Sequence, residues 1–370
     1  MTLAPIPLIR SADEITPEWA TDVLRANGGL GDGSVTSVTT ASFGDDAGLL
    51  GELFRVGLTY ADDPQTDGPA TFIVKLPSQA PEQRAMAEGL GLYLRELTFY
   101  TEHAHGMPFG VAGCFGAVMA EDSVDFVIVM EDLGGLDQID QVAGATLDQA
   151  RIAMTEFARF HALFWEHPDL AQLSEVYLPL SAPVYQFALP AVFEANWPHC
   201  KEREAANLTP EMVEFGDRFA SLIPFFLTEM AAPASLIHGD ARGDNMLLDA
   251  DQRLHLIDFQ VLGVATGLFD VAYFLCQTLA PEVRSGHDET LIGIYVDALA
   301  AAGVEGFGLD EAMRLYRICT AFCLFYATAS YQSWDAFDGR QHELMSALVH
   351  RTTQSVLDND CLALMPPAAS

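Results

Sequence analysis

Apolar residues alternate with polar ones, or form short unbroken runs, in several segments of the first third of the chain. A period of about two residues, bounded by Gly, Pro and Asp, is typical of β-strands. The expected strands cover residues 34–39, 53–60, 71–77, 111–119 and 123–130. We therefore expect a five-stranded sheet in this part of the chain.

Beyond Leu136 the apolar positions recur every three or four residues, which indicates helices. The helices expected there cover residues 146–166, 210–230, 286–302, 309–333 and 340–358. The N-terminal third contributes a short helix that begins near Pro17 and a longer one over residues 81–103. Residues 168–208 contain several prolines and aromatic residues with little periodicity, so we expect a connection between helices there.

Composition narrows the class of protein. Half of the 370 residues are hydrophobic, enough for one large core or two lobes. The formal net charge of −34 argues against a nucleic-acid partner or an anionic membrane surface and suits a neutral or cationic ligand. The N-terminus has no basic start typical of a secretory signal, and the longest apolar run, residues 318–329, is too short for a membrane span. Six cysteines without a C-x-x-C pair favour a reducing cytoplasm, and we expect a monomer or homodimer.

The stretch from Leu236 to Gln260 combines apolar strands with acidic and amide side chains. Strands over residues 245–248 and 253–257 are joined by an Asp-Ala-Asp-Gln turn, and the hairpin brings Asn245 and Asp258 to the same end. Asp240, on a loop five residues before Asn245, can face the same space. Such oxygen ligands suit Mg²⁺, with a spare carboxylate to act on a hydroxyl. The alternative is an ordinary polar hairpin with solvated acids.

Lys75 is one of only two lysines in the chain, and it lies within an apolar strand, T-F-I-V-K-L-P. A buried ammonium group is costly unless an anion pairs with it. Glu96, on the helix that follows, is the candidate partner. The alternative is a lysine on an edge strand whose ammonium reaches solvent.

Four motifs in this order carry a family resemblance: K-L-P followed by R-E-x-x-F-Y, H-A-x-F-W, H-G-D-x-x-x-x-N followed by I-D-F, and D-x-A-x-F-L. Together they resemble the aminoglycoside phosphotransferase and choline kinase superfamily, relatives of the protein kinases, over residues 40–350. The ending I-D-F-Q is most similar to the ecdysteroid-kinase-like branch.

The resemblance implies an α+β, two-lobed protein-kinase-like fold. The N-terminal nucleotide-binding lobe, residues 1–131, would be small, with an antiparallel sheet plus a helix. Residues 132–135 would form the hinge. Residues 136–370 would form a larger, mainly helical lobe for catalysis and acceptor binding.

The resemblance also implies roles for single residues. Asp240 would be the catalytic base, while Asn245 and Asp258 would hold Mg²⁺ on the phosphates of ATP. Lys75, fixed by Glu96, would orient those phosphates.

Other residues would take part around this centre. The backbone of Glu131 and Leu133 would bind the adenine edge, and Asp270 would brace the catalytic loop. A loop with Gly44 and Gly48 could bring backbone N–H groups to the phosphates, although its two aspartates are poorly suited to that role and an ordinary hairpin turn is the simpler explanation.

The expected function is an ATP- and Mg²⁺-dependent small-molecule kinase that phosphorylates a hydroxyl of a fairly apolar, steroid-like alcohol. One alternative is a cationic acceptor of the aminoglycoside or choline type, and another is a nucleotide-binding pseudokinase with a regulatory role. Aromatic residues in two segments are candidates for the acceptor wall: Tyr177, Tyr185, Phe187, Phe193 and Trp197, and Tyr326, Tyr331, Trp334 and Phe337.

Overall fold

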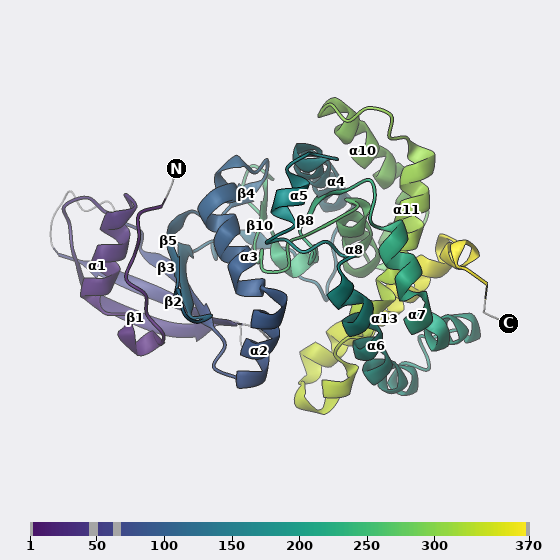
Figure 1. Cartoon of the computed structure of the whole chain (residues 1–370), viewed down its shortest axis with the longest axis horizontal. Coiled ribbons are helices and arrows are strands. Elements are labelled where there is room, and N and C mark those ends of the chain that lie inside the picture. Colours follow the sequence, from purple (N-terminus) through teal and green to yellow (C-terminus); the bar gives the residue numbers. More distant parts are fainter. Residues whose placement is uncertain (1–2, 44–50, 62–67, 368–370) are drawn as a thin grey trace. The chain divides into compact units, whose positions relative to one another are not determined.

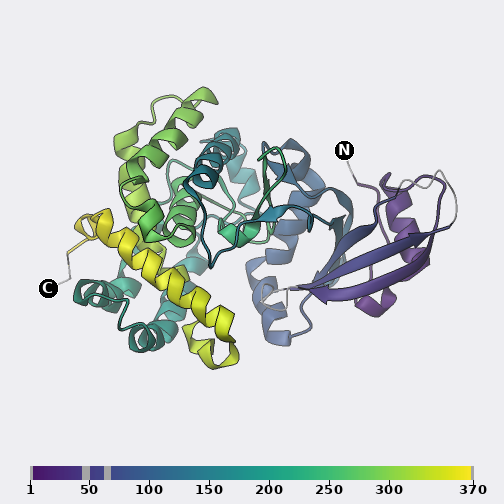
Figure 2. The same cartoon turned by 180° about the vertical axis from the view of Figure 1, so that it is seen from behind.

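The computed structural model describes residues 3–43, 51–61 and 68–367. The chain divides into two compact units (Figures 1 and 2). Unit 1 comprises Met1–Asp137 together with Ile257–Val261, and unit 2 comprises Gln138–Leu256 and Leu262–Ser370. Each unit is described here by itself.

Unit 1 contains a five-stranded sheet in which every neighbouring pair is antiparallel, with the order β1-β2-β3-β6-β5. The strands are β1 (Val35–Phe43), β2 (Gly51–Tyr60), β3 (Thr71–Pro77), β5 (Cys114–Met119) and β6 (Phe126–Glu131). The predicted sheet is therefore confirmed. One detail differs, because Gly110–Val111 forms a separate short strand, β4, and does not extend β5.

Helix α1 (Pro17–Ala26) covers one face of this sheet. It begins after Thr16, whose hydroxyl accepts a hydrogen bond from the Trp19 N–H, with Pro17 in the first turn as predicted. Trp19 packs edge-on against Phe72 of β3 at 6.3 Å between ring centroids. The core beneath the helix is aliphatic and includes Val23, Leu24, Val56, Val74, Val127 and Val129. A helix and a sheet that bury their apolar faces together form a single packed layer pair.

The single helix predicted over residues 81–103 is wrong. Gly91 adopts a left-handed conformation, φ +66°, and ends α2 (Pro81–Leu90). Glycine takes that conformation without the steric cost of a Cβ, which is why it often ends helices. Helix α3 (Leu92–Thr98) follows and continues into a π-helical turn, Phe99–His103. Glu96 therefore lies on a short helix of its own.

Unit 2 is mainly helical. Its helices are α4 (Leu147–Phe164), α5 (Leu170–Leu173), α6 (Pro183–Arg203), α7 (Pro210–Glu229), α8 (Leu268–Thr278), α9 (Pro281–Arg284), α10 (Asp288–Ala301), α11 (Leu309–Phe322), α12 (Leu324–Thr328) and α13 (Gly339–Asp358). The predicted helices are present, except that the one expected over 309–333 is divided between α11 and α12. Two short strand pairs complete the unit: β8 (Ser235–Ile237) with β11 (Gly263–Ala265), and β9 (Met246–Leu248) with β10 (Leu254–Leu256). The strand β7 (Asp137–Gln138) spans the division between the units.

The irregular connection predicted over residues 168–208 is wrong, because most of this segment forms helix α6. Pro190 and Pro198 lie inside this helix of 21 residues, although a proline removes a backbone hydrogen bond and costs about 3 kcal/mol in a helix interior. Buried residues at helical spacing offset that cost, among them Phe193 and Trp197. Phe193 stacks on Phe219 of α7 at 4.3 Å. Tertiary packing has overridden local propensity here.

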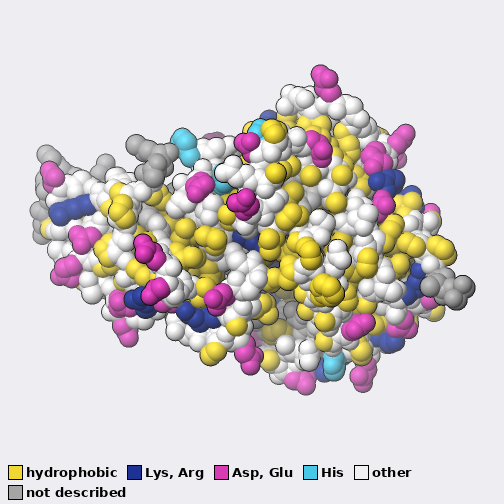
Figure 3. All heavy atoms as spheres, viewed as in Figure 1, with side chains coloured by type: hydrophobic (Ala, Val, Ile, Leu, Met, Phe, Trp, Pro, Cys, Tyr) yellow, Lys and Arg dark blue, Asp and Glu magenta, His cyan; other side chains and the backbone are white. Residues whose placement is uncertain are grey.

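Charged side chains are dispersed on the surface. On the face drawn in Figure 3, Asp and Glu side chains are scattered over both units, and hydrophobic side chains cover much of the surface of unit 2. Among the described residues, no helix is both long enough and apolar enough to cross a membrane.

A glycine pair tests the packing of α6 on α7. A Cβ at Gly216 of α7 would lie 2.1 Å from the Trp197 ring, whereas a Cβ at Gly293 of α10 would meet no atom within 4 Å. We expect Gly216→Ala to lower the free energy of unfolding by about 1–3 kcal/mol through overpacking. Gly293→Ala should raise it by about 0.5–1 kcal/mol through helix propensity. Urea unfolding followed by circular dichroism measures both, and equal effects would contradict the packing described.

Candidate functional site

The residues His238–Asn245, here called the Asp240 loop, connect two anchored strands of unit 2. Strand β8 precedes the loop and pairs with β11, with Ile237 opposite Gly263. Strand β9 follows it and pairs with β10, with Met246 opposite Leu256. The predicted hairpin is therefore present, and both ends of the loop are fixed by strand pairing.

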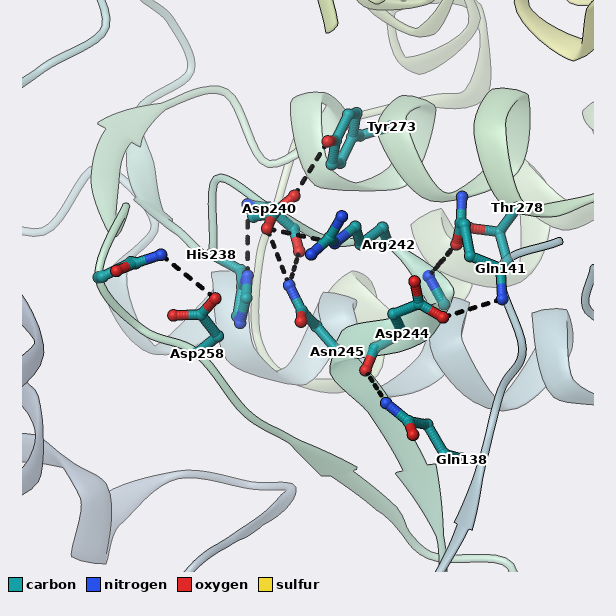
Figure 4. A network of polar contacts seen from close by, with 12 residues as sticks. Gln138, Gln141, His238, Asp240, Arg242, Asp244, Asn245, Asp258, Tyr273 and Thr278 are labelled. Atoms are coloured by element: carbon teal, nitrogen blue, oxygen red, sulfur yellow. Dashed lines mark hydrogen bonds and ion pairs between the residues drawn. The ribbon is translucent and has the colours of Figure 1, made fainter. Parts of the chain in front are cut away.

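Both carboxylate oxygens of Asp240 accept hydrogen bonds (Figure 4). The Tyr273 hydroxyl of α8 donates to Oδ1 at 2.9 Å, and the Asn245 amide donates to Oδ2 at 2.9 Å. The Arg242 guanidinium lies 3.5 Å from Oδ2 as an ion-pair partner. The side chain is thus held in one orientation, and each oxygen, having two lone pairs, can accept a further proton or hydrogen bond.

The N-terminal end of α8 holds the start of the loop through Asp270, whose side chain is fully buried. The backbone N–H groups of His238 and Gly239 donate to its two oxygens at 2.6 and 2.9 Å. His161 of α4 lies 3.2 Å from the same carboxylate, and its other ring nitrogen contacts the Tyr295 hydroxyl at 2.9 Å. Asp270 braces the loop as predicted, and His161 is a buried core histidine with both nitrogens paired.

The C-terminal end of α8 holds the other half of the loop. The Gly243 N–H donates to Thr278 Oγ1 at 3.1 Å and to Gln141 Oε1 at 2.5 Å. A Cβ on Gly243 would lie 2.8 Å from both side chains, so glycine is required for this close approach. The buried Arg351 of α13 donates to the carbonyls of Gln141 and Gln277, which supports the network from behind.

Three further polar residues of the loop have defined contacts. The His238 ring is fully buried and its Nδ1 accepts the Asp240 N–H at 3.3 Å, so it shapes the loop. The Asp244 carboxylate accepts the Gln141 N–H at 3.0 Å, which is a structural contact. Arg242 pairs with the carboxylate of Asp240.

In unit 1, Lys75 lies between two carboxylates. Its Nζ is 2.6 Å from Glu96 Oε2 and 3.2 Å from Asp258 Oδ1. The side chains of Lys75 and Glu96 are only 8% and 2% exposed. The predicted Lys75–Glu96 ion pair is therefore present and buried, and Asp258 joins it.

Burial and charge act in opposite directions in this trio. Burial alone would lower the pKa of Lys75, but the charges of Asp258 and Glu96 outweigh it and raise the pKa of Lys75 above its usual value. Burial raises the pKa of Glu96, while Lys75 opposes that shift. Lys75 therefore remains a cation under ordinary conditions.

The segment around Asp258 is attached to unit 1 by its aromatic neighbour. Phe259 stacks on Phe99 at 3.6 Å between ring centroids, directly after α3. Asp258 has a positive φ of +65°, which is uncommon for a residue other than glycine and is tolerated best by Asn and Asp. Gln260 donates to Asp258 Oδ2 at 3.3 Å, so the Q of I-D-F-Q contacts the aspartate of the motif.

The remaining predicted nucleotide contacts are less defined. Gly44 and Gly48 lie outside the described residues. Glu131 ends β6, where its N–H donates to the Gly113 carbonyl at 2.7 Å, and the Leu133 carbonyl accepts the Leu136 N–H at 2.9 Å.

The acidic residue between Glu131 and Leu133 anchors this connection to the sheet. Asp132 forms a two-pronged ion pair with Arg55 of β2 at 2.7 and 3.0 Å. Burial alone would raise the pKa of Asp132, but its hydrogen bonds, led by the one from Arg55, outweigh burial and lower that pKa. The pair ties the start of the predicted hinge to the sheet of unit 1.

The aromatic candidates for an acceptor wall fall into different environments. Phe193, Trp197, Tyr177 and Tyr331 are buried core residues. Tyr326 of α12 packs against Tyr273 at 4.8 Å, which places it next to the partner of Asp240. Phe187 of α6 is 78% exposed.

Sequence reasoning missed Tyr273, Gln141 and Thr278. Tyr273 had a readable signal, because it lies three residues after Asp270 and so on the same face of α8. Gln141 had none, since it lies about one hundred residues before the loop it contacts.

Comparison with known proteins identifies the class. The model of the ecdysteroid kinase-like family matches residues 47–303, more than half of the chain. The chain therefore belongs to the ecdysteroid kinase-like family, and it is a kinase-like phosphotransferase that uses an alcohol group as acceptor. A search of curated proteins finds no match.

Solved structures show the same fold at low sequence identity. A putative aminoglycoside phosphotransferase from Ralstonia eutropha JMP134 is 14% identical, with a TM-score of 0.53 over 90% of this chain and 94% of that one. Choline kinase from Cryptosporidium parvum Iowa II is 10% identical, with a TM-score of 0.54 over 88% and 92%. The GDP complex of aminoglycoside 2'-phosphotransferase-IIIa is 13% identical, with a TM-score of 0.52 over 92% and 99%. These likenesses confirm the α+β, protein-kinase-like fold.

The brace at the start of α8 can be tested with a shape-conserving change. Asp270→Asn replaces one acceptor oxygen by an NH₂ group that faces a buried N–H donor. We expect the free energy of unfolding to fall by about 2–4 kcal/mol, because a buried donor loses its acceptor and a buried charge is removed from its partners. Asp297→Asn, at an exposed position of α10, is the matched control and should stay within about 0.5 kcal/mol. Equal midpoints in urea for the two variants would show that Asp270 does not brace the loop.

Proposed function

We propose that this protein is an ATP- and Mg²⁺-dependent kinase that transfers the γ-phosphoryl group to a hydroxyl of a neutral, fairly apolar small molecule. The observation that carries the proposal is the buried trio of Lys75, Glu96 and Asp258. A buried ion pair contributes little net stability compared with apolar packing, so its presence calls for a functional explanation. Membership of the ecdysteroid kinase-like family supports the reaction class.

The donor set suits a magnesium nucleotide. The side-chain NH₂ of Asn245 donates a hydrogen bond to Asp240. The amide oxygen of Asn245 is therefore the atom that would bind a cation. The Asp258 carboxylate would supply the second oxygen ligand, and oxygen ligands are those that Mg²⁺ prefers. Bound Mg²⁺ would neutralise charge on the phosphates. Lys75, which stays protonated beside its two carboxylates, would orient the α- and β-phosphates, and the backbone of Glu131 and Leu133 would contact the adenine.

Asp240 would accept the proton of the attacking hydroxyl. Its carboxylate is fixed through both oxygens, so it need not reorient during the reaction. Catalysis would then depend on positioning and on charge stabilisation more than on covalent chemistry by the protein.

The surroundings of Asp240 favour a neutral acceptor. The charged group that contacts its carboxylate is the cation of Arg242, which would repel an aminoglycoside or choline-type amine. Tyr273 and Tyr326 add aromatic surface beside it. The net charge of −34 is the feature that favours a cationic acceptor instead. A nucleotide-binding pseudokinase remains the alternative of another class, and the retention of Lys75 and Asp240 argues against it.

Transfer of phosphate from ATP should be measured across ecdysteroids, other hydrophobic alcohols, aminoglycosides and choline. We expect one of the first two groups to be phosphorylated and Asp240→Asn to lower kcat by about 10²–10⁴-fold, because a general base is lost. Asp251→Asn, an exposed aspartate in the turn of the nearby hairpin, is the control and should be unchanged. Selective transfer to aminoglycosides or choline would overturn the neutral acceptor, and tight ATP binding without any transfer would favour the pseudokinase.

The nucleotide role can be separated from the chemical step by using the two lysines of the chain. Lys75→Met should weaken Mg²⁺-ATP binding by about tenfold or more, because a buried, charge-assisted contact is removed. Lys201→Met removes the other lysine, which is 40% exposed, and should leave binding unchanged. Isothermal titration calorimetry on folded protein, repeated with EDTA to remove Mg²⁺, measures both. Unchanged affinity in Lys75→Met would contradict the assignment.

A further inference from the structure

The Tyr273 hydroxyl is placed to act on Asp240. The ring is buried, with 6% of the residue exposed, and it stacks on Phe269 of the same helix at 6.1 Å and against Tyr326 at 4.8 Å. These contacts fix the ring, so its hydroxyl is held toward Asp240 Oδ1 at 2.9 Å (Figure 4). A phenylalanine at this position could make the same ring contacts, so core packing does not explain the hydroxyl.

We infer that Tyr273 is a positioning residue that holds Asp240 in the orientation of a general base. The inference rests on the proposed function, in which Asp240 accepts the proton of the acceptor hydroxyl. Within that reaction, Tyr273 fixes one oxygen and Asn245 fixes the other, so the carboxylate cannot rotate. Neither donor comes from the substrate, so the orientation exists before substrate binds.

The direction of this hydrogen bond is also defined. Burial, together with the negative charge of Asp240, raises the pKa of the Tyr273 hydroxyl well above its ordinary value. The hydroxyl therefore stays protonated and can only donate to a charged carboxylate.

Tyr273 is one of several groups that lie near Asp240. The charged and titratable side chains are Arg242 and His238 in the same loop, Tyr273 on α8 and Tyr326 on α12. Arg242 and Asn245 also hold the carboxylate, so Tyr273 supplies one part of that restraint. Removal of its hydroxyl should weaken the base without abolishing it.

The test is Tyr273→Phe, which keeps the ring and its packing and removes only the donor. We expect kcat of Mg²⁺-ATP turnover, with the acceptor found above or with water, to fall by about 10- to 100-fold, as one charge-assisted hydrogen bond would give. KM for Mg²⁺-ATP should not change, since Lys75 and its partners are untouched.

Tyr316→Phe is the matched control. Tyr316 is a buried tyrosine of α11 whose hydroxyl donates to the Asp288 carboxylate, away from the Asp240 loop. It should lower stability without lowering kcat. If Tyr273→Phe lowers kcat no further than Tyr316→Phe does, or raises KM for Mg²⁺-ATP in place of lowering kcat, the positioning role is overturned.

A second measurement keeps the inference testable if the wild type transfers no phosphate, an outcome that would overturn the proposed function itself. Tyr273→Phe and Asp240→Ala, which leaves no acceptor for the hydroxyl, are combined in a double-mutant cycle, read from urea midpoints. Non-additive midpoints would support the interaction of the Tyr273 hydroxyl with Asp240, while its role in catalysis would be refuted. Additive midpoints would show that Tyr273 does not position Asp240 either.

Discussion

The hydrogen bonds from α8 to the Asp240 loop are the interaction on which unit 2 depends. The helix contacts the loop at its first turn through Asp270, near its middle through Tyr273 and at its last residue through Thr278. All three contacts are buried or nearly so, and every residue of α8 is buried. A loop that crosses a protein interior must have its backbone donors satisfied, and α8 satisfies several of them. The position of the loop is consequently set by the helix that supports it.

A second constraint governs unit 1, where a cation is held away from water. Lys75 is compensated by two carboxylates from different parts of the chain, one on α3 and one on the Ile257–Val261 segment. The break at Gly91 gives α3 a direction separate from that of α2, and α3 carries Glu96. The stacking of Phe259 on Phe99 holds Asp258 beside the same helix. The residue that supplies the second carboxylate, Asp258, has an uncommon backbone conformation with a positive φ. Its carboxylate helps to balance the charge of Lys75.

The sequence predicted the elements better than their ends. Strong periodicity located the five strands, the hairpin of Met246–Leu256 and most of the helices, and the motifs located Lys75, Glu96 and the role of Asp270. Predictions failed where tertiary contacts decided the outcome: the prolines of α6 are accommodated because Phe193 packs on α7. Gln141 could not be found, because a contact between distant residues leaves no local pattern. Single glycines are ambiguous in the same way, and Gly91 ended a helix where the pattern predicted continuation.

The segment Ile257–Val261 belongs to unit 1, although the residues on either side of it belong to unit 2. The chain therefore crosses the division three times, after Asp137, after Leu256 and after Val261. Neither unit is a continuous stretch of sequence, so a fragment that stops at Asp137 would leave Phe99 without its stacking partner and Lys75 with one carboxylate in place of two. A single crossover between this gene and the gene of a relative could therefore not exchange either unit intact.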